Sequence, residues 1–164
     1  MKSASVKEIK TELSQRSHQE LMELCLRLSR FKKENKELLT YLLFESTDEE
    51  EYIHNVKNEI NEQFEVINTA SYHYIKKSVR KILRTIKKYI RYSKNKETEI
   101  ELLIHFCKKL KKFNPYIQKS TVLQSILNRE IIGIKKKLLG LHEDLQYDYA
   151  LELQKIQSYN ISNL

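Results

Sequence analysis

Glycine and proline are almost absent from this chain of 164 residues, which contains two glycines and one proline. So few turn-forming residues exclude a loop-rich β-sandwich, a collagen-like chain and a flexible Pro/Gly-rich linker. Tryptophan is absent, and the two cysteines are too few for a disulfide framework. We therefore expect a cytoplasmic protein in which both thiols are reduced.

Long apolar runs are also absent, and no stretch approaches the roughly 20 residues that a membrane-spanning helix needs. The opening residues, MKSASVKEIK, are polar and do not resemble a secretory signal. A Gly-rich phosphate loop and the motifs of serine hydrolases and zinc proteases are missing. We predict no membrane span, no cofactor, no catalytic residue and no enzymatic activity.

The chain is rich in leucine, isoleucine, lysine and glutamate, a composition typical of amphipathic helices. Apolar residues recur at three- and four-residue spacing, and no alternating strand pattern appears. We predict an all-α fold, an antiparallel bundle of about five to six helices, with a short αα-superhelix as the alternative. Residues 1–159 would form a single helical domain and residues 160–164 a frayed tail. The Lys-, Ile- and Asn-rich composition suggests a bacterial source.

Helix starts are indicated by four Ser/Thr-x-x-Glu patterns, which begin at Ser5, Ser17, Thr47 and Thr98. In such a capping box the hydroxyl accepts from a backbone amide and the carboxylate reaches back to the cap. The apolar phase does not decide whether residues 18–45 form one helix or two joined near Asn35.

In the second half of the chain, apolar side chains cover more than half the circumference of residues 97–112, so we place that helix at the bundle centre. The clearest break is Phe113-Asn114-Pro115, because proline cannot continue a helix. A last helix would then run from Ser120 or Thr121 almost to the end. Gly133 and Gly140 would share one face of it, which favours a close backbone approach by a neighbouring helix.

The least ordinary feature is the distribution of charge. The net charge is +8, yet residues 45–75 carry one basic and eight acidic residues, whereas residues 76–96 carry ten basic residues and no acidic one. As a helix, the second stretch would bury its Ile/Val side and leave a cationic ridge beside Tyr89 and Tyr92. Such a ridge attracts phosphates by counterion release, with little base reading.

We therefore predict a non-enzymatic binding or adaptor protein whose basic segment, residues 76–96, contacts an anionic macromolecule. That partner would be nucleic-acid backbone or an acidic protein surface. The candidate contact residues are its Lys and Arg side chains: Lys76, Lys77, Arg80, Lys81, Arg84, Lys87, Lys88 and Arg91.

Several other interpretations stay open from the sequence alone. The ridge could simply be solvated, lie on anionic lipid, or pair with the acidic stretch inside the molecule. Pairing between copies would instead build a homo-oligomer that dissociates as salt rises. A metal or enzyme site would need dispersed side chains such as Glu51, His54, Glu101 and His105. Both cysteines, Cys25 and Cys107, fall on apolar stripes and are expected to be buried.

Overall fold

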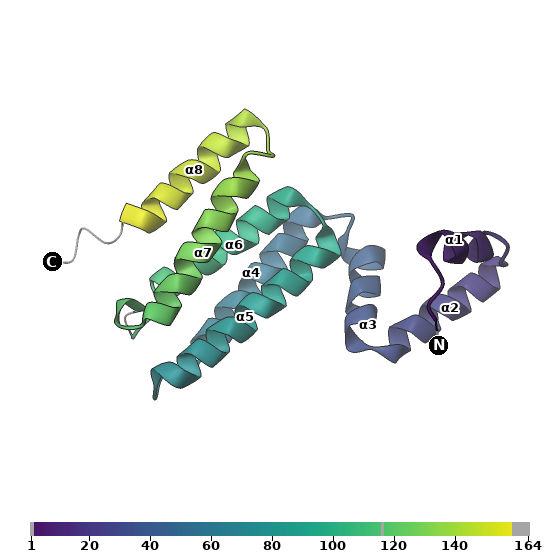
Figure 1. Cartoon of the computed structure of the whole chain (residues 1–164), viewed down its shortest axis with the longest axis horizontal. Coiled ribbons are helices and arrows are strands. Elements are labelled where there is room, and N and C mark those ends of the chain that lie inside the picture. Colours follow the sequence, from purple (N-terminus) through teal and green to yellow (C-terminus); the bar gives the residue numbers. More distant parts are fainter. Residues whose placement is uncertain (1, 116, 159–164) are drawn as a thin grey trace. The chain divides into compact units, whose positions relative to one another are not determined.

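The computed structural model describes residues 2–115 and 117–158, and the regular secondary structure of these residues is entirely helical (Figure 1). Eight α-helices form over this part of the chain, more than the five to six expected, and a π-helical turn (Tyr41–Glu45) and a 3₁₀ turn (Ile117–Lys119) connect some of them. The helices are α1 (Val6–Ser14), α2 (His18–Phe31), α3 (Lys33–Thr40), α4 (Glu49–Glu65), α5 (Tyr72–Ser93), α6 (Lys96–Lys111), α7 (Thr121–Leu138) and α8 (Glu143–Ser158).

The chain divides into two compact units, Met1–Phe44 and Glu45–Leu164, which are described separately here as unit 1 and unit 2. That residues 1–159 act as one domain stays a prediction. The tail 160–164 lies outside the described residues. None of the described helices is both long enough and apolar enough to cross a bilayer.

Unit 1 consists of three short helices with almost no core. Ser5 and Ser17 form the predicted capping boxes with Glu8 and Glu20. The chain breaks between α2 and α3 at Lys32, whose φ of −142° and ψ of 147° are extended, so residues 18–45 do not form one helix. Tyr41 is the one buried apolar residue among those described in the unit.

Unit 2 contains a genuine bundle, with α6 at its centre as predicted. Helix α6 contacts α4, α5, α7 and α8, and α4 packs on α5 (Figure 1). Its side chains Ile100, Leu102, Phe106 and Leu110 are fully buried. Because apolar residues surround α6 on most sides, neighbouring helices can cover it all round.

Two helix starts differ from the predicted ones because a better cap lies nearby. Asp48, not Thr47, caps α4 and accepts from the backbone amide of Glu51. Asn95 caps α6, with its side-chain oxygen 2.8 Å from the amide nitrogen of Glu97. Asp and Asn are stronger N-caps than Thr. Thr98 is consequently a helix residue, and its side chain is buried.

The predicted single last helix is wrong, because the chain turns between α7 and α8 over Leu139–His142. The apolar phase continues across this turn, which is why the sequence reads as one helix. Gly140 lies in the turn, where an added Cβ would sit 3.4 Å from Lys96 Nζ. At Gly133, inside α7, an added Cβ would meet nothing within 4 Å, so no neighbouring helix approaches this glycine closely.

Candidate interface for an anionic partner

Helix α5 presents the basic segment as one face of a long amphipathic helix. Its opposite side is fully buried at Ile75, Val79 and Ile86. Six cations lie exposed on the outer face, at helical spacings of three and four residues. We call them the basic stripe: Lys77, Arg80, Lys81, Arg84, Lys87 and Arg91. At 1.5 Å per residue the stripe is about 21 Å long.

Most of the basic stripe has no carboxylate partner. Among the described residues, none forms an ion pair with Lys77, Arg80, Lys81, Arg84 or Arg91. Unpaired cations on a rigid helix retain their full charge for an external anion, and they lie close enough together to act jointly on a polyanion.

Lys87 is the exception, because it reaches a carboxylate on α7. Its Nζ lies 3.0 Å from Oε1 of Glu130, and Nε of Arg129 lies 3.3 Å from the same oxygen. The Glu130 side chain is only 6% exposed, whereas those of Lys87 and Arg129 are 48% and 67% exposed. The Glu130 carboxylate thus forms ion pairs with two cations at once, one on α5 and one on α7.

Glu130 and Arg129 were missed by the sequence analysis. The available signal was an acidic residue within the buried apolar phase of α7, between Leu127 and Ile131. A carboxylate at a core position requires a cationic or hydrogen-bonding partner. The sequence does not say which of thirty basic residues supplies it.

The remaining predicted contact residues are less available. Lys76 and Lys88 are half-buried, and Lys88 Nζ lies 5.0 Å from the centre of the Tyr89 ring. Tyr92 is buried, and Tyr89 donates its hydroxyl to Glu59 at 2.9 Å. Of the two tyrosines expected beside the ridge, Tyr89 therefore bonds to α4 and Tyr92 is buried.

Two carboxylates of the acidic helix α4 accept hydrogen bonds from hydroxyl groups of α5. Glu49 accepts from Ser93, and Glu59 from Tyr89. The one lysine of α4, Lys57, pairs across to Glu101 of α6. These contacts attach α4 to its neighbours without drawing on Arg80 or Arg84 of the basic stripe.

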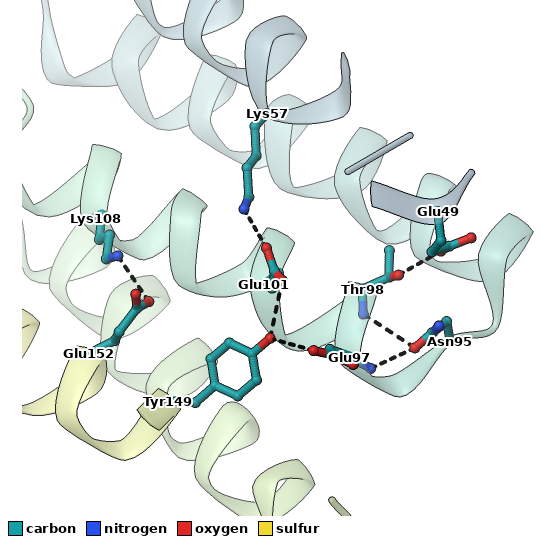
Figure 2. Close-up of polar contacts among 9 residues, drawn as sticks. All are labelled: Glu49, Lys57, Asn95, Glu97, Thr98, Glu101, Lys108, Tyr149 and Glu152. Atoms are coloured by element: carbon teal, nitrogen blue, oxygen red, sulfur yellow. Dashed lines mark hydrogen bonds and ion pairs between the residues drawn. The ribbon is translucent and has the colours of Figure 1, made fainter. Parts of the chain in front are cut away.

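A polar cleft of about 430 Å³ opens between the N-terminal parts of α4 and α6, and Figure 2 shows part of its wall. Thr98 donates to Glu49 at 2.6 Å, and Lys57 pairs with Glu101. The Tyr149 hydroxyl of α8 lies 3.2 Å from Glu97 and 3.1 Å from Glu101. Burial, together with these two carboxylates, raises the pKa of Tyr149 above its usual value.

The structure does not assemble the four side chains considered for a metal site. His54 and Glu101 both line the polar cleft, but Glu51 is exposed outside it and His105 is hydrogen-bonded to Asn61 at 2.9 Å. Within the part of the chain that the structure describes, no three His, Cys, Asp or Glu side chains are grouped to hold a metal ion. The cleft carboxylates of Glu49, Glu97 and Glu101 each accept from a protein donor.

The two cysteines differ in their environments. Cys107 is buried as predicted, and burial, together with the nearby carboxylate of Glu130, raises the pKa of its thiol to about 12. Cys25 is exposed, contrary to the prediction, because it lines an apolar groove between α2 and α3 that stays open to solvent. No known family, curated protein sequence or solved structure matches this chain.

Proposed function

We propose that this protein acts by binding, and that the basic stripe of α5 docks on the sugar-phosphate backbone of a nucleic acid. The observation that carries the proposal is the row of exposed cations that form no ion pair with any described residue: Lys77, Arg80, Lys81, Arg84 and Arg91. Such a row suits a partner whose negative charges also follow a line, as phosphates do.

The packing of α5 against α4 and α6 favours a fixed docking surface. The inner side of α5 is buried along its length, so the cations are held by a packed helix and not by a mobile loop. Along the solvent-facing stripe, Tyr92 is buried and the Tyr89 hydroxyl is bonded to Glu59, and the exposed aromatic side chain of α5, Tyr74, lies before the stripe begins. Binding should therefore be electrostatic and tolerant of base sequence.

The proposal is tested by fluorescence anisotropy with labelled duplex DNA, single-stranded DNA and RNA. If the stripe neutralises five or six phosphates, affinity should fall roughly 10³-fold between about 50 and about 200 mM salt. Reversing two charges, Arg80→Glu with Arg84→Glu, should abolish binding at either salt concentration. Far-UV circular dichroism would check that the variant keeps its helices.

A matched control separates a local surface from overall charge. Lys136→Glu with Lys155→Glu makes the same change in net charge at two exposed lysines of α7 and α8. This control should bind nearly as well as the unmodified protein. Equal loss in both double variants would contradict a specific stripe, and so would no binding to any nucleic acid at low salt. Binding to polyglutamate alone would show that the partner is an acidic protein surface instead.

We propose in addition that the protein is cytoplasmic and has no enzymatic activity. The homo-oligomer held by acidic and basic helices makes a different prediction, since its mass in solution would fall as salt rises and Arg80→Glu would dissociate it.

A further inference from the structure

Unit 1 leaves its apolar side chains in solvent. Eleven large apolar residues of this unit are between 39% and 83% exposed: Val6, Ile9, Leu13, Met22, Leu24, Leu26, Leu28, Phe31, Leu42, Leu43 and Phe44. Monomeric proteins rarely expose a contiguous apolar patch above a few hundred Å². A unit of 44 residues in which Tyr41 alone is buried among the described residues also lacks the burial needed to offset the entropy of ordering its chain.

The helices of the unit are nevertheless well terminated. Both capping boxes are complete, and Arg16 ties α1 to α2 through ion pairs with Glu12 and Glu20 at 3.9 and 3.3 Å. These exposed contacts contribute little stability. The apolar faces of α1 and α2 are therefore available to a partner.

A groove of about 510 Å³ runs between α1 and α2, open to solvent. Its apolar lining comes from Ile9 and Leu13 of α1 and Leu24 of α2. Charged side chains of both signs also line it: Glu8, Glu12 and Arg16 on one side, and Glu20, Glu23 and Arg27 along α2. The groove therefore combines apolar side chains with charges of both signs, and Arg27 is its cation at the C-terminal end of α2.

The spacing of Glu20 and Arg27 on α2 allows two copies of the helix to pair reciprocally. One face of α2 carries Glu20, Leu24, Arg27 and Phe31, at positions i, i+4, i+7 and i+11. If a second copy of α2 lies antiparallel across a twofold axis between residues 23 and 24, Glu20 of each copy faces Arg27 of the other. Position 24 of one copy then lies opposite position 23 of the other, so the two Leu24 side chains come together beside the axis. An isologous interface requires this reciprocity.

We infer that unit 1 is a dimerisation element, in which α2 of a second copy of this chain occupies the groove between α1 and α2. The occupant is a second copy because Glu20 and Arg27 of one α2 can pair with Arg27 and Glu20 of another. A standard interface takes about 800 Å² from each partner, and Ile9, Leu13, Leu24 and Phe31, which are between 39% and 76% exposed, would form its apolar centre. This inference is independent of nucleic-acid binding by α5.

The test is analytical ultracentrifugation of the full chain over a range of protein concentrations. We expect a reversible monomer–dimer equilibrium, and Leu24→Asp should raise the dissociation constant at least 100-fold. Ile132→Asp introduces the same charge at an apolar position of α7 that is 56% exposed, and it should leave the equilibrium unchanged. A chain that is monomeric at every concentration would overturn the inference, and so would equal effects of the two variants.

Charge reversal tests the antiparallel register without relying on Leu24. Arg27→Glu places two carboxylates opposite each other and should weaken the dimer at least tenfold, as should Glu20→Lys. Combining the two substitutions restores opposite charges across the axis and should recover most of the affinity. Glu20→Lys removes a capping carboxylate, but the double variant lacks that carboxylate too, so recovery can come only from pairing between copies. No recovery would overturn the proposed register.

Discussion

His105 shows how a single side chain on the polar side of α6 responds to its surroundings. Burial is the main reason that the pKa of this imidazole is lowered to about 4, and the nearby cations Lys57, Lys109 and Lys108 add to the effect. Its Nε2 lies 2.9 Å from Oδ1 of Asn61. Because an unfolded histidine titrates near 6.5, the unfolded chain binds a proton in a pH range where the folded protein does not.

The free energy of unfolding should therefore fall as pH drops from about 6.5 to about 4, and this contribution is fully present above that range. We expect it to be on the order of 1 kcal/mol, because the imidazole is partly exposed and solvent screens its charge. Urea unfolding at pH 7, 5.5 and 4.5 would measure it. His105→Gln should flatten the profile, whereas His54→Gln, at an exposed histidine, should not. Parallel profiles for all three proteins would contradict the assignment.

For some side chains the apolar periodicity predicts whether they are exposed, whereas the contacts of others depend on a residue far away in the sequence. The exposed cations Arg80 and Arg84 follow from the amphipathic pattern of α5 alone. The pairing of Lys87 with Glu130 joins residues 43 positions apart, and such a contact is not encoded in local spacing. Cys25 illustrates a third case, because an apolar stripe predicts burial only when another element covers it.

At the scale of helices, the sequence predicted their existence well and their ends less well. Ser5 and Ser17 were assigned correctly because each stands alone at its helix start, whereas Asp48 and Asn95 displaced the neighbouring threonines as caps. The turn between α7 and α8 was hidden because apolar residues keep their phase across it. Periodicity therefore indicates which face of a helix can be buried, and local cap chemistry decides where the helix ends.

Gly133 gives a direct test of packing along α7. It lies inside the helix, and an added Cβ would contact nothing within 4 Å. Gly133→Ala should therefore raise the free energy of unfolding by about 0.5–1 kcal/mol, because alanine loses less backbone entropy in a helix. Urea denaturation of the variant measures the change. A loss of stability would instead show that a backbone approaches this position closely.

At the scale of the molecule, the core and the exposed apolar surface belong to different units. All buried apolar residues other than Tyr41 lie in unit 2, among the residues that the structure describes. The sequence could not show this division, since the apolar stripes of α1 and α2 look as regular as those of the bundle. Regular stripes mark faces that can be buried without saying by what.

A chain shortened to residues 45–164 should accordingly fold on its own. We expect it to unfold cooperatively in urea and to keep the proposed nucleic-acid binding of α5, because the helices that hold the basic stripe are all present. It should also sediment as a monomer at concentrations where the full chain dimerises. Circular dichroism and sedimentation velocity would measure these properties. A fragment without a cooperative transition would show that unit 2 needs unit 1 for its stability.

The two thiols are divided in the same way, one in each unit. Cys25 is exposed and Cys107 is buried with a raised pKa. A thiol-specific alkylating reagent should therefore modify Cys25 quickly in the native protein and reach Cys107 only when the bundle opens. The rate at Cys107 then reports the opening of unit 2, and slower modification of Cys25 at higher protein concentration would report coverage of unit 1. The unmodified chain thus carries a separate chemical reporter for each of its two parts.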